Sequence, residues 1–383
     1  MKTNARRIAA YIFARWLVTH EFPSSLLPTD GNRAFVQDLV YTAIRRLRPL
    51  RRALGEFVKK WPKGELESLL YIGAAQVLYM PAVADYAAVN ETVAAAREGS
   101  NPNVPKVVNA VLRNLIRRRE EMHALIAAAP AEVRESFPSA LYRRWVGRFG
   151  AADAEKLCAW HNAPGETYLA WKPGDRFEKL ARGVRVEDVA GFAEGAFIVQ
   201  DPGTRLAVEL MDVQPGEAAL DLCAAPGGKT VQLAWRGAAV TACEVNPKRR
   251  ARLAENLKRL KLDGVVVVGE PPVGTFPKVL VDAPCSNTGV LRRRPDARWS
   301  WSEEKMRQLV AVQAEILDVA ASRVAPGGRL VYSTCSNEPE ENQEQVEKFL
   351  ARHPEFTCVD MRESIPFASG CDGAFAAALA VAP

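Results

Sequence analysis

Hydrophobic residues recur at intervals of three and four through the first 130 positions of the chain. This helical spacing is clear in ARRIAAYIFARWLV, RAFVQDLVYTAIRRL, ELESLLYIGAAQVLY and VPKVVNAVLRNLIRRR. Pro and Gly residues separate these segments, as at Pro23, Pro62 and the GSNPN turn at 99–103. Residues 1–130 are therefore predicted to form an all-α helical bundle.

From about residue 216 the pattern changes to short apolar runs that alternate with amphipathic helices. The runs EAALDLCAA, AAVTACEV, GVVVVG, KVLVDAP and RLVYSTC are predicted strands, and KRRARLAENLKRL and SEEKMRQLVAVQAEILDVAASRV are predicted helices. This alternation indicates a mainly parallel, doubly wound α/β sheet within a domain at 201–383. Residues 131–200 have a mixed pattern with more Gly and Pro, and are predicted to form a small α+β connector.

Composition narrows the class of protein. The chain has 383 residues, of which 48% are hydrophobic and 25% charged, which is ordinary for a globular protein. No apolar run is long enough to span a bilayer, and Arg15 interrupts the only segment that resembles a signal peptide. The seven cysteines are scattered and form no CxxC pair, which argues against a disulfide framework and a zinc site. We expect a cytoplasmic protein that has reduced thiols and binds no metal.

Positive charge is concentrated in the N-terminal part of the chain. Residues 1–150 hold 23 Lys and Arg against 13 Asp and Glu, whereas the rest holds 28 against 32. A basic half suggests a polyanionic partner such as nucleic acid, and a solvated helical surface is an equally good explanation of the charge alone.

Two predicted strands end on cysteines. LVYSTCSNEPEENQE carries Cys335 at the end of a strand and just before a helix, and VLVDAPCS carries Asp282 and Cys285 in a similar place. In a doubly wound sheet, ligands bind at the carboxyl ends of the strands, so Asp282 and Cys335 are predicted to face one crevice. A single strand-end cysteine is usually a packing residue, but two beside an acid indicate chemistry.

The segment DLCAAPGGKT follows the first predicted strand of the sheet and opens a helix. Gly227 and Gly228 allow the backbone to approach a ligand closely, but the segment matches neither the P-loop nor the dinucleotide pattern. One strand later, Glu244 is placed to accept both hydroxyls of a ribose. A glycine loop followed by an acid suits a nucleoside cofactor without a phosphate chain, such as S-adenosylmethionine.

Three motifs, DLCAAPGGKT, DAPCSNTGVLRRRPDARW and YSTCSNEPEEN, together resemble the Sun-type RNA cytosine-C5 methyltransferase family. QDPGTRLAVELM resembles the entry segment of that family, and the N-terminal bundle, with VNAVLRN, is similar to the NusB-like RNA-binding domain that precedes the catalytic part in a member acting on small-subunit ribosomal RNA. The resemblance implies a multidomain protein in which a NusB-like bundle and the connector precede a Rossmann-like methyltransferase domain. It covers nearly the whole chain.

The resemblance also implies roles for individual residues. Glu244 would hold the ribose of S-adenosylmethionine, Glu270 would lie beside the adenine, and Asp282 would face both cofactor and cytosine. Lys229 joins Asp282, Cys285 and Cys335 in the implied catalytic set. The cofactor would be lined by Cys223, Ala224, Ala225, Pro226, Gly227, Gly228 and Lys229. The family's DGFF motif reads Asp372-Gly373-Ala374-Phe375 in this chain.

The implied chemistry explains why two thiols and an acid are needed. Addition of a thiolate to C6 of cytosine makes C5 nucleophilic enough to attack a methylsulfonium. Cys335 is expected to be this nucleophile, Asp282 to bind the exocyclic amine and N3, and Cys285 to assist release of Cys335. DNA cytosine methyltransferases instead attack with the thiol at the position of Cys285, and spacing alone does not decide between the two.

The substrate is expected to be an RNA with an unstacked target base. Arg292, Arg293, Arg294 and Arg298, beside the catalytic strand, are predicted to contact its phosphates. Small-subunit ribosomal RNA is the favoured substrate and a monomer the expected state. The alternatives are the same chemistry on transfer RNA, or an RNA-binding assembly factor with an idle methyltransferase core.

Overall fold

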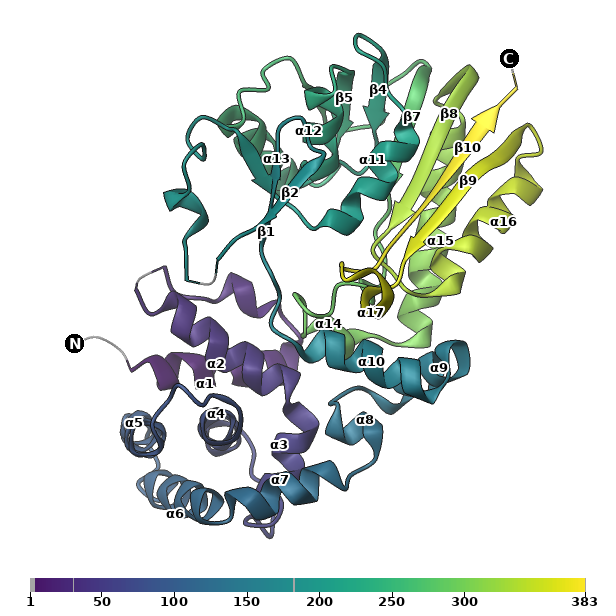
Figure 1. The fold of residues 1–383 in the computed structure, drawn as a ribbon. Coiled ribbons are helices and arrows are strands. Elements are labelled where there is room, and N and C mark those ends of the chain that lie inside the picture. The colour runs from purple at the N-terminus through teal and green to yellow at the C-terminus, as the bar shows by residue number, and fades with distance from the viewer. Residues whose placement is uncertain (1–3, 30, 182, 383) are drawn as a thin grey trace. The chain divides into compact units, whose positions relative to one another are not determined.

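The computed structural model describes residues 4–29, 31–181 and 183–382, which belong to two compact units. The first unit extends to Asn162 and also contains Arg294–Ser300. The second contains Ala163–Arg293 and the chain from Trp301 onward. The predicted multidomain architecture, an all-α part followed by an α/β part, is confirmed (Figure 1).

The first unit is built from helices. They are α1 (Ala5–Thr19), α2 (Arg33–Arg45), α3 (Leu47–Leu54), α4 (Glu65–Tyr79), α5 (Asp85–Arg97), α6 (Val104–Arg117), α7 (Arg119–Ala127), α8 (Ala131–Arg134), α9 (Ser139–Phe149), α10 (Ala151–Asn162) and the short α14 (Ala297–Ser300). Helix α4 is buried from Ser68 to Leu78 and contacts α1, α2, α5 and α6. A helix that is apolar on every side must lie inside the bundle, which explains the central position of α4.

The predicted connector at 131–200 is divided between the two units at Asn162 and Ala163. Its helices α8–α10 belong with the bundle, because Arg48 of α3 donates hydrogen bonds to Phe137 O (2.6 Å) and Ser139 Oγ (3.0 Å). Its strands belong with the second unit. The predicted boundaries at 130 and 200 therefore differ from the boundary of the compact units.

The second unit contains two sheets. The small antiparallel sheet has the order β2-β1-β3, formed by β1 (Tyr168–Trp171), β2 (Arg176–Lys179) and β3 (Phe197–Val199). The large sheet has the order β6-β5-β4-β7-β8-β10-β9. Its strands are β4 (Ala218–Asp221), β5 (Ala239–Cys243), β6 (Val266–Val268), β7 (Phe276–Asp282), β8 (Val324–Thr334), β9 (Phe356–Ser364) and β10 (Ala374–Val381).

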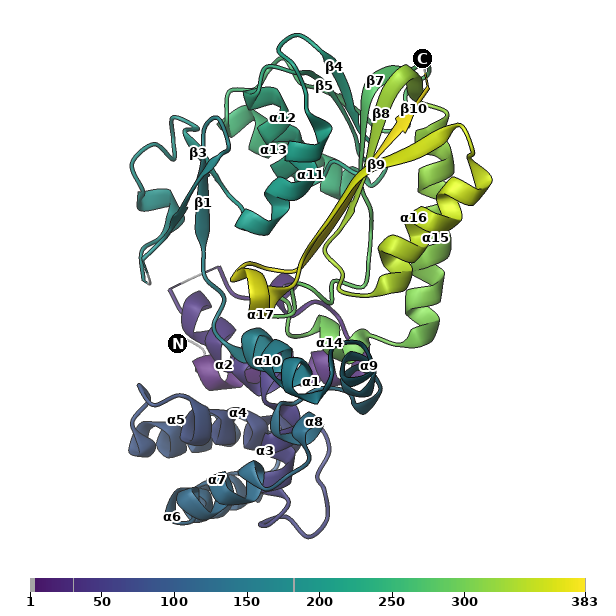
Figure 2. The same ribbon diagram turned by 45° about the vertical axis from the view of Figure 1, so that its right-hand side comes forward.

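Neighbouring strands from β6 to β8 are parallel, and β10 is antiparallel to both β8 and β9. Helices α11 (Arg205–Met211), α12 (Gly228–Trp235) and α13 (Pro247–Arg259) cover one face, and α15 (Glu303–Ala321) and α16 (Gln343–Arg352) cover the other (Figure 2). The short α17 (Pro366–Ser369) precedes β10. The parallel strands place their carboxyl ends at one edge, where the predicted site residues lie.

The apolar runs of β7 (279–281) and β8 (330–332) are buried on both faces. Val279 and Val281 pack on the side of α15, whereas Leu280 packs on the side of α11. This explains why each of these runs is apolar without a polar face. It also fixes the positions of Asp282 and Cys335, because a slip of one residue in register would turn every side chain to the opposite face.

Candidate active site

The loop after β4 leads directly into α12. Gly227 has a φ of 106°, and a Cβ there would lie 2.7 Å from Leu253 Cδ1. Asn256 Nδ2 supports the loop from α13 by donating to Pro226 O (2.8 Å). The glycines therefore allow a tight turn that presents Cys223–Lys229 at the carboxyl edge of the sheet.

Asp221, the last residue of β4, lies beneath this loop. It is fully buried, and its Oδ2 accepts a hydrogen bond from Thr230 Oγ1 (2.6 Å). Burial raises the pKa of Asp221 to about 6, and the hydrogen bond from Thr230 only partly offsets this effect. Its position at the strand end was visible in the sequence, but its burial was not.

Two further carboxylates follow the neighbouring strands. Glu244 follows β5, is 3% exposed, and accepts a hydrogen bond from Asn246 N (2.8 Å). Glu270 follows β6 and is exposed. Burial and the charge of Glu244, followed by the charges of Asp221 and Glu270, raise the pKa of the Cys243 thiol at the end of β5 to about 11.

Lys229 connects the loop at 223–229 to β7. Its Nζ lies 2.6 Å from Asp282 Oδ2, and Ser333 Oγ of β8 donates to Asp282 Oδ1 (3.0 Å). Burial lowers the pKa of Lys229, but the charge and hydrogen bond of Asp282 outweigh this effect and raise it. Lys229 is therefore a largely buried cation that orients the Asp282 carboxylate. The separate sequence motifs did not reveal this ion pair.

The two strand-end thiols are in contact. Cys285 Sγ and Cys335 Sγ lie 3.3 Å apart. Cys335 Sγ also donates a hydrogen bond to Asn287 Oδ1 (3.3 Å). The hydrogen bond with Cys335 and burial raise the pKa of Cys285 well above its ordinary value. Cys285 is therefore a neutral thiol placed to donate to the sulfur of Cys335.

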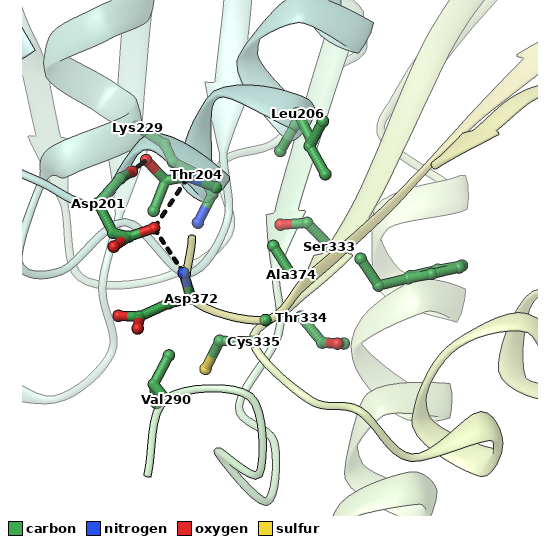
Figure 3. Close-up of a pocket in the computed structure, with 14 residues that line it drawn as sticks. Asp201, Thr204, Leu206, Lys229, Val290, Ser333, Thr334, Cys335, Asp372 and Ala374 are labelled. Atoms are coloured by element: carbon green, nitrogen blue, oxygen red, sulfur yellow. Dashed lines mark hydrogen bonds between the residues drawn. The ribbon is translucent and has the colours of Figure 1, made fainter. Parts of the chain in front are cut away.

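A cavity distinguishes the two thiols. Cys335, Lys229 and Ser333 contribute to its lining, together with Asp201 and Asp372 (Figure 3). Cys285 is 7% exposed and does not line the cavity. Cys335 is thus the thiol that a molecule in the cavity would meet, with Cys285 behind it.

The sequence motifs did not identify all of the groups around the cavity. Arg293 forms ion pairs with Asp201 (2.8 Å) and with Asp372, and Asp201 Oδ1 accepts from Asp372 N (3.0 Å). Asp201 belongs to the QDPGTRLAVELM segment, which was singled out only as an entry segment. Burial raises the pKa of Asp372.

All four arginines predicted to contact RNA have partners within the protein. Arg298 is fully buried and donates to Ser136 O, His161 O and Asn162 Oδ1, so its prediction as an RNA contact is wrong. Arg292 is 7% exposed and donates to Pro164 O (2.6 Å), which also contradicts the prediction.

Arg293 and Arg294 are partly exposed but have protein partners. Arg293 bridges the two aspartates of the cavity, and Arg294 pairs with Asp296 (3.0 Å) and lies over the ring of Phe22. Each guanidinium group has its cited partners within its own unit: Arg292 and Arg293 in the second unit, and Arg294 and Arg298 in the first. These partners are carboxylates, an aromatic ring and carbonyl oxygens.

Among the described residues, no group of three or more His, Cys, Asp or Glu side chains could hold a metal ion. No helix within the described ranges is both long enough and apolar enough to cross a membrane.

Comparison with known proteins identifies the family. Residues 208–379 match the model of the 16S rRNA methyltransferase RsmB/F family, and residues 3–117 match the NusB family. The ribosomal RNA small subunit methyltransferase B of Serratia proteamaculans is 34% identical, with 98% of each chain covered. The chain belongs to the 16S rRNA methyltransferase RsmB/F family.

Another relative and two solved structures are also similar to this chain. The ribosomal RNA small subunit methyltransferase B of Pectobacterium atrosepticum is 32% identical, again with 98% of each chain covered. The crystal structure of PH0851 superposes with a TM-score of 0.77 over 99% of each chain at 22% identity. NSun6 from Pyrococcus horikoshii, solved with SFG, superposes with a TM-score of 0.57 over 65% of this chain and 99% of that chain at 18% identity. These two structures share the fold.

Proposed function

We propose that this RsmB/F family member methylates C5 of cytosine in small-subunit ribosomal RNA through a covalent bond between Cys335 and C6. The observation that carries the proposal is the arrangement of the thiols. Cys335 lines the cavity, and the Sγ of Cys285, which does not line it, lies 3.3 Å from the Sγ of Cys335. Lys229 lines the same cavity and holds Asp282 by an ion pair of 2.6 Å.

The cofactor of the proposed reaction is S-adenosylmethionine, which supplies an electrophilic methyl group. The residues present fit this ligand. The loop at 223–228 has only small side chains and Pro226, and an added Cβ on Gly228 would lie 3.1 Å from Gln200 Nε2. Glu244 and Glu270 follow the next two strands and supply carboxylates for the ribose and the adenine.

Cys335 would begin the reaction by adding to C6 as a thiolate. Cys285 stabilises this thiolate by donating its S–H, because its raised pKa keeps it protonated. Asp282 accepts a hydrogen bond from the exocyclic amine of the base while Lys229 and Ser333 fix the direction of its carboxylate. The enamine formed in the ring makes C5 nucleophilic, so that C5 would bond to the methyl group while the methyl–sulfonium bond breaks and the cofactor leaves as a neutral thioether.

Release would reverse the first step. The proton on C5 leaves to a water in the cavity, the electron pair forms the C5–C6 double bond, and the C6–S bond breaks. Cys285 again donates to the departing thiolate of Cys335, which makes that sulfur a better leaving group. The two thiols thus have different tasks, with one forming the bond and the other helping to break it.

Product analysis tests the proposal. The full chain is incubated with S-adenosylmethionine carrying a labelled methyl group and with small-subunit ribosomal RNA, transfer RNA or large-subunit RNA, and the digested nucleosides are separated. We expect 5-methylcytosine in small-subunit RNA. Label in another nucleoside, or in transfer RNA alone, would contradict the proposed reaction or substrate, and no label in any RNA would favour an idle assembly factor.

A further inference from the structure

The loops that carry the two thiols share one buried carboxylate. Glu341 lies in the turn before α16 and is fully buried. Its Oε1 accepts from Ser286 N (2.8 Å), and its Oε2 accepts from the hydroxyls of Ser286 and Ser336. Ser286 follows Cys285 and Ser336 follows Cys335, so one carboxylate holds the residue next to each thiol.

A second side chain connects Glu341 to the backbone beside Cys285. Gln313 Nε2 of α15 donates both to Glu341 Oε1 (3.1 Å) and to Pro284 O (2.9 Å), and Pro284 directly precedes Cys285. Tyr332 Oη of β8 donates to Glu341 O (2.7 Å). The position of Glu341 is therefore fixed by one strand of the sheet, β8, and by one helix that covers it, α15.

The two loops also contact each other directly. Gly289 N donates to Cys335 O (3.0 Å), and Asn337 N donates to Thr288 Oγ1 (2.9 Å). These bonds do not involve Glu341. Loss of the carboxylate would therefore leave the loops attached but free to shift relative to each other.

We propose that Glu341 is a positioning residue, which holds the loops of Cys285 and Cys335 so that the two sulfurs stay in contact. The inference rests on the proposed division of labour between the thiols. Glu341 does not line the cavity, so it acts through Ser286 and Ser336 and not on the substrate.

The distance between the sulfurs can be measured without RNA. Methylarsonous acid bridges two thiols that lie in contact, forming two As–S bonds and releasing two waters. The rate of bridging between Cys285 and Cys335 in the full chain is followed by peptide mass mapping. Cys285→Ser identifies the signal of this pair, because it removes one of the two bonds to arsenic.

Three variants separate positioning from folding. Glu341→Ala is expected to slow bridging about tenfold and to lower kcat about a hundredfold, with the KM for S-adenosylmethionine unchanged. Glu341→Gln is expected to restore both rates to within about threefold, because its carbonyl oxygen replaces Oε1 and its amide can donate to both hydroxyls. Glu344→Ala, at an exposed residue paired with Lys348, is the control and should match the wild type.

Each outcome decides the inference. Wild-type bridging and kcat in Glu341→Ala would overturn it, and so would equal losses in Glu341→Gln accompanied by a lower melting temperature. If Glu341→Ala does not fold, Ser336→Ala takes its place, and unchanged bridging in that variant would overturn the inference. If bridging responds as expected but no RNA gains 5-methylcytosine, the proposed function fails and the positioning role stands.

Discussion

The thiol pair and the contacts of Arg298 are two buried polar arrangements with different roles. The three hydrogen bonds of Arg298 go to protein oxygens, and its guanidinium lies 4.0 Å from the centre of the Phe137 ring. Cys335, by contrast, lines a cavity and contacts the second thiol. Both sites bury polar groups, but only the thiol site leaves a reactive atom accessible to a ligand.

The difference shows how a buried polar group can be assigned a role in stability or in chemistry. A group whose partners are protein carbonyls, away from any cavity, contributes to stability, because removing it leaves those carbonyls unpaired. A group that lines a cavity and is oriented by neighbours that the cavity does not reach is available for chemistry. Arg298 belongs to the first class and Cys335 to the second, so their replacement should change different measurements.

Replacement of Cys335 should have the largest effect. Cys335→Ala is expected to lower methyl transfer by at least about 10⁴-fold, because it removes the attacking sulfur. The affinity for S-adenosylmethionine, measured by calorimetry, should stay within about twofold of the wild type because the loop at 223–229 is untouched. Methyl transfer near the wild-type rate would show that another group attacks C6.

Arg298→Ala should act on stability instead. We expect the free energy of unfolding to fall by about 3–4 kcal/mol, from three lost hydrogen bonds and a cavity beside Phe137. Urea unfolding measures this loss, and Arg113→Ala, at an exposed arginine of α6, is the control with an effect below about 0.5 kcal/mol. A stable Arg298→Ala protein with weakened RNA binding would restore the original prediction that Arg298 contacts phosphate.

Asp221 should give a pH-dependent effect on stability. Its folded-state pKa of about 6 lies above its ordinary value of 3.8, so the folded protein binds more protons between these pH values. Wild-type stability should therefore decrease as the pH rises from about 4 to 6, by roughly 2–3 kcal/mol, and remain lower above that range. Asp221→Asn should lack this decrease in urea unfolding at each pH. An identical pH dependence in both proteins would refute the assignment.

Glu244 should give the smallest effect of the four. Glu244→Gln is expected to weaken binding of S-adenosylmethionine about tenfold, because a neutral amide accepts hydroxyl hydrogen bonds less strongly than a carboxylate. Glu270→Gln should weaken binding of S-adenosylmethionine only about threefold, because water competes for the hydrogen bonds of an exposed carboxylate. Calorimetric titration measures both, and the reverse order would exchange the assigned ribose and adenine sides.

Strands β7 and β8 could be predicted because their sequence pattern is local. Apolar runs that end at Asp282 and Cys335 specify buried parallel strands, and the topology then brings their carboxyl ends to one edge. The two C-terminal strands were missed. The run AFAAALAV forms β10, although alanine favours helices, because burial between β8 and β9 outweighs the preference of the residue.

The arginines could not be assigned in the same way, because their partners are distant in sequence. Arg298 meets Asn162 across 136 positions, and Arg293 meets Asp201 across 92. A charged segment has the same sequence pattern whether it is exposed or buried. Only the packing of distant elements shows that Arg292 and Arg298 are enclosed.

The roles of Glu341 and Lys229 likewise depend on contacts between separate motifs. Glu341 was visible only as part of a polar helix start, and nothing in its surroundings along the chain indicated that it is buried beside both thiols. The charge of Lys229 was evident, but its ion pair with Asp282 joins the start of α12 to the end of β7.

The covalent adduct tests the central claim, that Cys335 attacks and Cys285 assists release, most directly. Each variant is incubated with S-adenosylmethionine and end-labelled small-subunit ribosomal RNA and is run on a denaturing gel. Cys285→Ala should accumulate a band shifted by the mass of the RNA, because it forms the C6–S bond but breaks it slowly. Cys335→Ala and the double variant should show no such band. An adduct that accumulates in Cys335→Ala and not in Cys285→Ala would contradict the account.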